Sequence, residues 1–386
     1  MIPFFSKRNQ VYPILWEGQA AAGKWFSCSE DWKNETAVYA ELQGKLSVPQ
    51  VLHAEPDMLV TAYCPCPTLL AVLEAQEQEG FSEKPWRVLA QWLHMFYRLT
   101  GKTPGEGNLR NYLWDAASGE VLGLDFETCR QQPLSEYGAE LIAAILEYAP
   151  RDTPVKLQAS RLLAELFGIE TASIIEKRAA LRLRRQAKKN PPQLSGIVLA
   201  GGQSRRMGQN KSALQIGGKT LLERQVEKLR MLGISDILIS GADIPETFGA
   251  RAVPDQYRSR GPVGGLHACF AQAECSSCLV LSVDTPLLPV SLLNYIRRSH
   301  TEGITVLAHH GKIEPLIGIY DSSLADAAKK LLETERASVR DLMEQTICQT
   351  LAYAGPEVFL QNCNTPDDFL SAQQTFEAYA AKGLTL

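Results

Sequence analysis

No apolar run in this 386-residue sequence approaches the roughly 20 residues that a transmembrane helix needs. The N-terminal run MIPFFSKRNQ has no apolar signal region either, so we expect a cytoplasmic protein with no membrane partner. Charge of one sign is not in excess. The 39 basic and 43 acidic side chains give a net charge of −4, which offers nothing to attract nucleic acid.

The cysteines are not arranged for a metal. The nine cysteines have irregular spacing, and in a reducing compartment most should be free thiols. Cys275 and Cys278 form one Cys-X-X-Cys pair, but no second cysteine or histidine pair stands at zinc spacing. Because Cys278 also leads into an apolar strand, we interpret both as structural thiols.

The length of the chain favours two domains, because one hydrophobic core seldom serves so many residues. The clearest boundary is a basic, helix-prone run at residues 176–194, which a Pro-Pro pair interrupts near its end. We predict domains over residues 1–175 and 195–386, joined by this basic helical linker. Its charges form either a solvated helix face or a surface for an anionic partner.

Strands and helices alternate after the linker, which indicates an α/β, Rossmann-like domain with a mostly parallel sheet covered on both faces. In such sheets, ligands bind beyond the carboxyl ends of the strands. The part before the linker is mixed, with β-rich residues 11–63 and an amphipathic helix at 85–100, and indicates an α+β domain. The alternating segments are strands at 196–201, 236–241, 277–284 and 303–310, and helices at 220–233, 264–273 and 291–300.

The run GIVLAGGQSRRMGQNK, residues 196–211, places glycines and cations after a buried strand. Gly201 and Gly202 leave backbone N–H groups open to an anion, and Arg206 and Lys211 are cationic donors for phosphate oxygens. Neither the Gly-Lys-Ser/Thr closure of a P-loop nor the third glycine of a dinucleotide fingerprint is present. We therefore predict a different loop that binds a nucleoside triphosphate.

Two carboxylates follow strands in the same domain. Asp284 ends the apolar run VLSVD, where it suits Mg²⁺, which takes few protein ligands and several phosphate oxygens, or caps the next helix. Asp255 precedes a glycine-rich turn with Gly264 and Gly265, which would let a nucleobase or phosphate approach closely. Asp255 is either part of that site or a turn residue.

Asn362 and Asn364 stand just before a helix start in NCNTPDDF, where Asn364 is either a ligand-facing amide or an N-cap.

Taken in order, LAGGQSRRMGQNK, PDQYRSRGPVGGL, SVDTPLL and NCNTPDDF resemble the molybdenum cofactor guanylyltransferase family. The resemblance covers about residues 195–376. It includes LAGG, where the related cytidylyltransferases usually show LAAG. One departure is Ser240-Gly241-Ala242, where the family often has an asparagine near the nucleotide.

The resemblance implies an Mg²⁺-dependent nucleotidyltransferase that moves GMP from GTP to the terminal phosphate of molybdopterin and releases pyrophosphate. Other enzymes of molybdenum cofactor metabolism are then possible partners. A cytidylyltransferase, a nucleotidyltransferase acting on a sugar or polyol phosphate, and a non-catalytic nucleotide sensor or adaptor stay as alternatives. The resemblance assigns Leu199, Ala200 and Gly201 to the guanine and ribose, Lys211 to phosphate, Asp255 to the nucleotide, Asp284 to Mg²⁺, and Asn362 and Asn364 to the pterin. From the residues themselves, we add Gly202, Gly264 and Gly265 to the predicted nucleotide site, and Arg206 to Lys211 as a cation for the phosphates.

The first domain has residues spaced like the phosphotransfer loop of small-molecule kinases. Asn111 follows Glu106 by five residues, and Asp125 follows the next strand. An amide and a carboxylate at neighbouring strand ends can hold Mg²⁺ against ATP phosphates. Upstream, Lys24 in a strand and Glu35 on the following helix could form the ion pair that orients those phosphates.

Together these features resemble the aminoglycoside-phosphotransferase-like and protein-kinase-like folds over about residues 10–150. The usual His-Gly-Asp is Pro104-Gly105-Glu106 here, and no clear glycine loop precedes Lys24. The longer arm of Glu106 would displace the catalytic carboxylate and slow phosphotransfer. Three interpretations stay open: an active kinase, a remnant that binds ATP or GTP with Mg²⁺, and a structural module.

Overall fold

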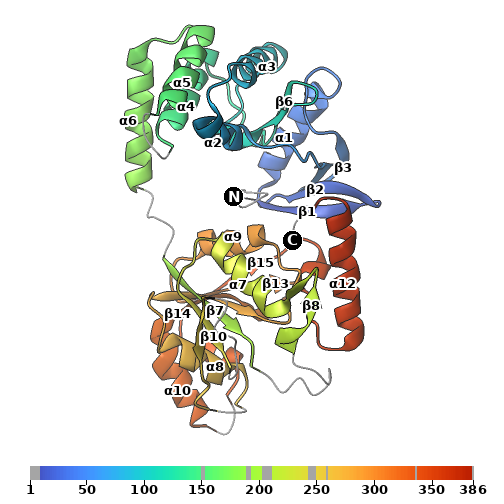
Figure 1. Ribbon diagram of the computed structural model, residues 1–386, viewed down its shortest axis with the longest axis vertical. Helices are drawn as coiled ribbons and strands as arrows, with labels where there is room; N and C mark the ends of the chain where they lie inside the picture. The colour runs from blue at the N-terminus through green and yellow to red at the C-terminus, as the bar shows by residue number, and fades with distance from the viewer. Residues whose placement is uncertain are drawn as a thin grey trace. The chain divides into compact units, whose positions relative to one another are not determined.

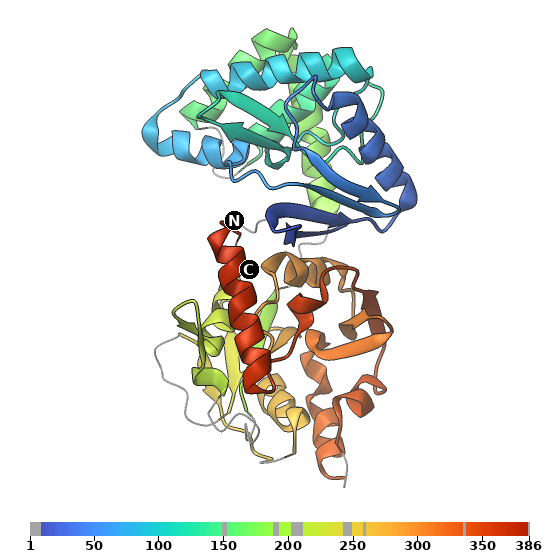
Figure 2. The same cartoon turned by 90° about the vertical axis from the view of Figure 1, so that its right-hand side faces the viewer.

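The computed structural model describes residues 9–148, 153–187, 193–201, 211–241, 249–257, 260–334 and 337–384 (Figures 1 and 2). The chain divides into two compact units, one of Met1–Trp25 with Pro191–Leu386 and the other of Phe26–Asn190. Within the described ranges, no helix combines the length and the apolar character that crossing a bilayer requires.

A seven-stranded sheet forms the centre of the unit that contains Pro191–Leu386. Its strands are β7 (Leu194–Leu199), β10 (Ile237–Ser240), β11 (Arg251–Val253), β12 (Ser277–Ser282), β13 (Ile304–His309), β14 (Lys312–Asp321) and β15 (Cys348–Ala352). In space they follow the order β11-β10-β7-β12-β14-β13-β15. Every neighbouring pair is parallel except the two that include β14, so the predicted mostly parallel α/β sheet is confirmed.

Helices cover both faces of this sheet (Figure 1). Alternate side chains such as Ile197 and Leu199 join a core with α8 (Pro262–Phe270), α10 (Ala325–Leu332) and α11 (Val339–Met343). On the other face, α7 (Leu221–Met231) packs Leu229 against Gly196, and α9 (Val290–Ser299) packs on β13 and β14. The long helix α12 (Pro366–Ala381) and several short elements complete the unit. The short elements are β8 (Gln215–Ile216), β9 (Lys219–Thr220), η2 (Lys211–Ala213), η4 (Ser322–Leu324) and η5 (Glu357–Leu360).

The first two strands belong to the same compact unit as this sheet. β1 (Gln10–Trp16) and β2 (Gln19–Trp25) form an antiparallel hairpin in which Trp16 pairs with Gln19. Glu17 and Gly18 make the two-residue turn, and both have the positive φ that a tight hairpin turn of this twist requires. The hairpin packs against α9.

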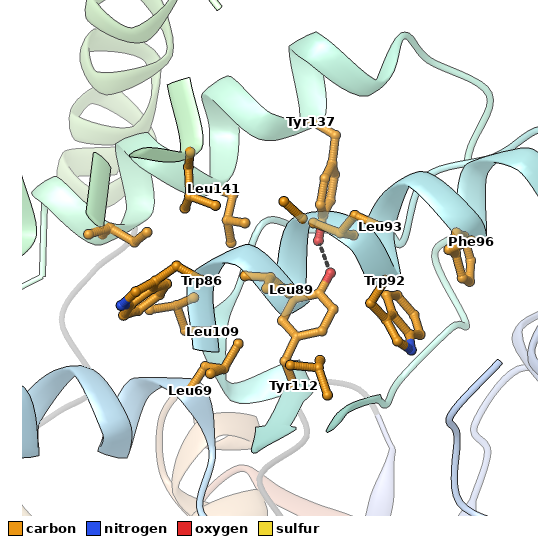
Figure 3. Close-up of a cluster of buried hydrophobic side chains, with 14 of the residues drawn as sticks. Leu69, Trp86, Leu89, Trp92, Leu93, Phe96, Leu109, Tyr112, Tyr137 and Leu141 are labelled. Atoms are coloured by element: carbon orange, nitrogen blue, oxygen red, sulfur yellow. Dashed lines mark hydrogen bonds between the residues drawn. The ribbon is translucent and has the colours of Figure 1, made fainter. Parts of the chain in front are cut away.

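The second unit contains both helices and strands, in keeping with the predicted α+β composition; its kinase-like fold stays a prediction. Its core is built along α3, where Trp86, Leu89, Leu93 and Phe96 repeat at helical spacing and are fully buried (Figure 3). The elements are α1 (Ser29–Leu42), β3 (Val51–Glu55), β4 (Met58–Ala62), α2 (Leu69–Glu79), α3 (Lys84–Thr100), η1 (Leu109–Asn111), β5 (Tyr112–Asp115), β6 (Glu120–Gly123), α4 (Leu134–Leu146), α5 (Pro154–Phe167) and α6 (Thr171–Ala187).

The basic run after residue 175 is partly integrated into this second unit. Its first residues are the C-terminal part of α6, which packs against α4. Arg178 and Arg182 both donate to one carboxylate oxygen of Glu147, at 2.9 and 2.8 Å. The Glu147 side chain is only 2% exposed, so these basic charges neutralise a buried acid rather than simply face solvent. Residues 188–192 lie outside the described residues.

Candidate functional site

The carboxyl ends of β7 and β12 lie side by side at one edge of the sheet. Leu199 pairs with Ser282, and the Val283 N–H donates to the Leu199 carbonyl at 3.2 Å. The chain then leaves β7 through Gly201 and leaves β12 through Asp284. Because ligands of parallel sheets bind beyond these strand ends, the geometry brings two of the predicted site segments to one place.

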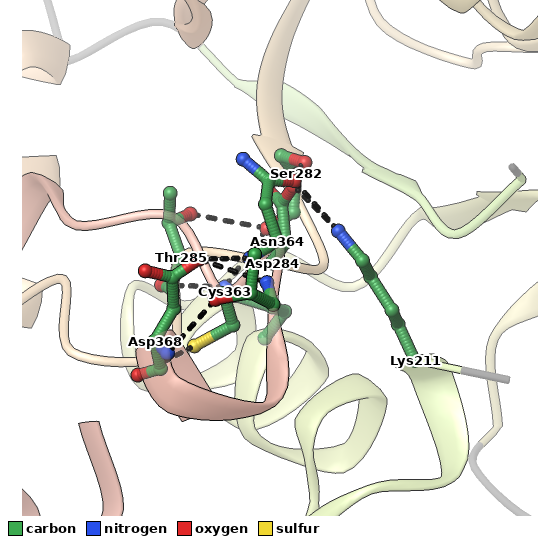
Figure 4. A network of polar contacts seen from close by, with 9 residues as sticks. Lys211, Ser282, Asp284, Thr285, Cys363, Asn364 and Asp368 are labelled. Atoms are coloured by element: carbon green, nitrogen blue, oxygen red, sulfur yellow. Dashed lines mark hydrogen bonds and ion pairs between the residues drawn. The ribbon is translucent and has the colours of Figure 1, made fainter. Parts of the chain in front are cut away.

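Asp284 is anchored on both of its carboxylate oxygens (Figure 4). Ser282 Oγ donates to Oδ1 at 2.5 Å, and the Lys211 Nζ lies 3.5 Å from Oδ2. The Asp284 side chain stays 19% exposed, which leaves room for a ligand. The alternative that Asp284 caps the next helix is excluded, because α9 begins at Val290 with Pro289 as its N-cap.

Asn364 completes this cluster from the other end of the domain. Its Oδ1 accepts a hydrogen bond of 2.7 Å from Lys211 Nζ. Asn364 does not cap α12, because Thr365 is the N-cap and forms a capping box with Asp368. The Cys363 N–H donates to the Asp284 carbonyl at 2.8 Å, which ties this segment directly to the strand end. Lys211, Asp284 and Asn364 are therefore brought together, and Asn362 lies half-buried two residues before Asn364.

Two buried side chains of α7 support the loop that carries Asp284. Gln225 Nε2 donates to the carbonyls of Ser282 and Thr285, both at 2.9 Å, and Lys228 Nζ donates to the Pro286 carbonyl at 2.6 Å. Among the described residues, the Gln225 Oε1 is buried without a hydrogen-bond partner, which is a cost that the two donated bonds must offset. Burial, with a smaller effect of Arg224, lowers the pKa of Lys228 to about 7.

Sequence reasoning missed both of these α7 residues. Polar side chains on an amphipathic helix are usually read as its solvent face. The position of Gln225 in the helix was the one sign that it is buried. It stands three residues after Leu222 and four before Leu229, on the apolar stripe of the helix.

The predicted nucleotide side lies around β7, β10 and the start of α8. The Ala200 N–H donates to the Ser240 carbonyl at 3.3 Å. A Cβ on Gly265 would come within 2.7 Å of Ser240 Oγ, so only glycine lets α8 approach β10 this closely. A Cβ on Gly264 would come within 2.8 Å of the Asp255 carboxylate, which therefore lies over the first turn of α8.

The Asp255 carboxylate also has a local partner, because Oδ1 accepts from the Tyr257 N–H at 2.9 Å. This is the contact of a turn residue, so the turn interpretation accounts for what the structure shows of Asp255. Its contact with a nucleotide stays a prediction. Gly202 and Arg206 lie outside the described residues, as does Ala242.

A second cluster of predicted residues lies in the other unit. Tyr112 pairs with Gly123 and the Leu124 N–H donates to the Asn111 carbonyl at 2.8 Å, so Asn111 and Asp125 flank the same end of the β5–β6 ribbon. Asp125 has φ of +64°, a conformation that residues with a side chain seldom adopt.

Carboxylate oxygens of Glu35, Asp125 and Glu127 all lie within 4.8 Å of one another. Glu127 was not predicted, although it stands two residues after Asp125 with buried Phe126 between them. Glu106 is exposed, and Lys24 is buried on β2, in the first compact unit. The structure therefore brings Glu35 and Asp125 together, and places Asn111 at the same ribbon end.

Comparison with known proteins agrees with the motifs of the larger sheet. Residues 196–350 match the family described as the MobA-like NTP transferase domain. The chain is similar to a probable molybdenum cofactor guanylyltransferase of Carboxydothermus hydrogenoformans, 31% identical over 183 residues, which are 46% of this chain and 93% of that protein. It is also similar to a molybdenum cofactor guanylyltransferase of Rhizobium meliloti, 32% identical over 194 residues, 46% of this chain and 89% of the relative.

Among solved structures, the chain is similar to molybdopterin-guanine dinucleotide biosynthesis protein A of Archaeoglobus fulgidus. The identity is 22% and the TM-score 0.42, over 48% of this chain and 99% of the other.

Proposed function

The chain belongs to the molybdenum cofactor guanylyltransferase family, and we propose that its C-terminal sheet domain transfers GMP from GTP to the terminal phosphate of molybdopterin, with release of pyrophosphate. The observation that carries the proposal is the cluster of Lys211, Asp284 and Asn364 at the carboxyl edge of β7 and β12. It combines a cation for phosphate, a carboxylate for a metal and an amide on the side where the acceptor would lie.

The donor set at this edge fits Mg²⁺. Asp284 is a hard oxygen ligand that is partly exposed, so phosphate oxygens of the substrate can complete the coordination shell. Asp284 would hold the ion, which when bound supplies Lewis-acid stabilisation of the charge on the phosphates. The Ser282 hydroxyl fixes the orientation of the carboxylate through Oδ1.

The remaining requirements fall on side chains of the domain. The acceptor phosphate oxygen is already ionised, so the reaction needs alignment with the α-phosphorus and neutralisation of charge rather than a strong base. Lys211 lies between Asp284 and Asn364, where its ammonium can contact phosphate without losing both of its present partners. Asn362 and Asn364 lie on the segment assigned to the pterin. Guanine would bind beside Leu199, Ala200 and Gly201.

The test is a transfer assay on the full chain with GTP, Mg²⁺ and molybdopterin, comparing the native protein with Asp284→Asn. The substitution keeps the size of the side chain and removes its charge, so transfer should fall by roughly 10²-fold or more while the melting temperature stays near native. Asp326→Asn is the matched control, because Asp326 is exposed on α10. Near-native turnover of Asp284→Asn would overturn the metal assignment.

We propose as a second function that the unit of Phe26–Asn190 binds ATP or GTP with a divalent cation. The three carboxylates of Glu35, Asp125 and Glu127 favour it, because oxygen ligands this close together repel one another unless a cation or a cationic side chain neutralises them. The left-handed backbone of Asp125 is a local strain of the kind that functional sites retain. With Glu106 in the place of the catalytic aspartate, we expect binding with slow phosphotransfer.

A further inference from the structure

We infer that the hairpin β1–β2 positions the acceptor segment of the transferase site: it holds residues 353–359 in place, and thereby the asparagines that follow. The inference rests on the proposed function for the role of those asparagines. The match to the family begins at residue 196, so the hairpin is an addition of this chain to the family domain.

The side-chain amide of Gln10 joins the hairpin to the chain that leaves β15. Gln10 Nε2 donates to the Ala352 carbonyl at 2.7 Å, and Gln10 Oε1 accepts from the Ala354 N–H at 3.1 Å. A single buried side chain therefore satisfies two backbone groups of one turn, much as a neighbouring strand would. Tyr12 orients this amide, because its hydroxyl donates to Gln10 Oε1 at 3.0 Å.

The Tyr12 ring is the centre of an aromatic cluster formed with the same turn. Tyr12 is 1% exposed, and its ring centroid lies 5.7 Å from that of Tyr353 and 5.8 Å from that of Phe359. A Cβ on Gly355 would come within 2.5 Å of the Tyr12 ring, so the turn closes around Tyr12 at a position where only glycine fits. The Tyr353 hydroxyl donates to the Pro356 carbonyl at 2.9 Å and fixes the turn from the other side.

The turn continues directly into the functional site. Phe359, on η5, is fully buried and packs against Tyr379 of α12, with ring centroids 5.9 Å apart. Four residues after Phe359, Cys363 donates to the Asp284 carbonyl, and Asn364 accepts from Lys211.

The hairpin thus contacts this segment between Ala352 and Phe359, and the same segment contacts the site at Cys363 and Asn364. Loss of the hairpin contacts therefore shifts the backbone that carries Cys363 and Asn364 into the site. Two of the residues assigned to the nucleotide, Leu199 and Ala200, take their backbone contacts from β10 and from the end of β12 instead. Loss of the hairpin contacts should therefore weaken binding of the acceptor and spare binding of GTP.

The experiment compares full-length Gln10→Ala with Gln19→Ala, which removes the same amide from an exposed position at the far end of the hairpin. Tyr12→Phe is the conservative variant, which keeps the ring and removes the hydroxyl that orients Gln10. Tyr12→Ala removes the ring as well. Hydrogen–deuterium exchange of residues 353–364 and the KM values for molybdopterin and GTP are measured on each.

We expect Gln10→Ala and Tyr12→Ala to increase exchange in residues 353–364 and to raise the KM for molybdopterin roughly tenfold, the equivalent of one or two lost hydrogen bonds. The KM for GTP should not change, Tyr12→Phe should have a smaller effect than Tyr12→Ala, and Gln19→Ala should match the native protein. If Tyr12→Ala does not fold, Gln10→Ala against Gln19→Ala decides the question.

Unchanged exchange in the Gln10→Ala protein would overturn the inference, and so would increased exchange with an unchanged KM for molybdopterin. Equal increases in both KM values would also contradict it, because they indicate a general loss of structure rather than a positioning role. If the native protein transfers no GMP, the proposed function fails, and the exchange data alone decide whether the hairpin holds the segment.

Discussion

The ammonium nitrogen of Lys211 lies 3.5 Å from Oδ2 of Asp284 and donates to Asn364 Oδ1 at 2.7 Å. One side chain thus connects the residue assigned to the metal with the segment assigned to the acceptor. A flexible lysine in this position can exchange its present partners for phosphate oxygens as substrates bind.

Replacement of Lys211 should slow transfer less than replacement of Asp284. We expect Lys211→Ala to lower kcat/KM by roughly 10- to 100-fold, because it removes one cationic donor and leaves the metal ligand in place. Lys211→Arg should recover part of the loss, since the positive charge is restored. A Lys211→Ala protein slower than Asp284→Ala in the same steady-state assay would reverse the assigned order of importance.

Gln225 should matter for both stability and turnover. Gln225→Met keeps the shape of the side chain but removes the buried amide donor that the Ser282 and Thr285 carbonyls share. The Ser282 carbonyl keeps the Thr285 hydroxyl as a donor, so the expected cost is about 1–3 kcal/mol in the free energy of unfolding, mainly from the Thr285 carbonyl. Because these carbonyls flank Asp284, kcat should fall as well. Urea unfolding and transfer assays measure the two effects, with exposed Gln215→Met as the matched control. A stable Gln225→Met protein with native kcat would show that α7 does not support the loop.

The buried Lys228 predicts a rise of stability with pH. Burial lowers its pKa from 10.5 to about 7, so between those pH values the unfolded chain binds the extra proton. Stability therefore increases as pH rises through this window, and this contribution is absent in Lys228→Met. Urea unfolding at pH 6.5 and 9 gives the difference directly. If the stability of the native and Lys228→Met proteins depends on pH in the same way, Lys228 is not the source of the rise.

Glu147 predicts the opposite behaviour in acid. Hydrogen bonds from Arg182 and Arg178 lower its pKa from 4.5 to about 2, so its contribution to stability is present above pH 4.5 and is lost as pH falls toward 2. Glu147→Gln should lower the stability of the Phe26–Asn190 unit at pH 7 and reduce its acid sensitivity. Glu83→Gln is the matched control, because the Glu83–Arg87 pair is exposed. If both substitutions have the same small effect on acid unfolding, the contacts of Glu147 with Arg178 and Arg182 contribute little to stability.

The second unit should bind nucleotide without rapid chemistry. In a full chain whose transferase site is disabled by Asp284→Asn, calorimetry with ATP and Mg²⁺ should give heat that Asp125→Asn removes. Phosphotransfer to small alcohols should be slow, and Glu106→Asp should accelerate it, because a shorter arm restores the usual position of the base. Fast native transfer that falls in Glu106→Asp would instead make Glu106 a working catalytic residue.

Local patterns were enough to predict most of the larger sheet. Apolar runs separated by amphipathic helices specify parallel strands, and β7, β10, β12 and β13 lie where the alternation places them. The antiparallel β14 was not predicted. It depends on a two-residue turn at His310–Gly311 with positive φ at both residues, and a His-Gly pair is a weaker signal than Asn-Gly.

The site also contains residues that the sequence reveals and residues that it does not. Lys211, Asp284 and Asn364 could be found because each lies in a short motif at an element end. Gln225 and Lys228 could not, since a polar residue on a helix does not reveal whether it faces solvent or a buried carbonyl. The contact of Gln10 with Ala352 and Ala354 joins opposite ends of the chain, and no local pattern encodes such a pairing.

The central claim is most directly tested by comparing GTP, CTP and ATP as donors to molybdopterin, with kcat/KM measured for the full-length protein and Mg²⁺. A site built to hydrogen-bond one base leaves polar groups unpaired with another, so we predict a preference for GTP of at least roughly a hundredfold. Equal kcat/KM for CTP would move the protein to the cytidylyltransferase interpretation. Binding of GTP without transfer of any nucleotide would contradict the account and make the protein a nucleotide sensor.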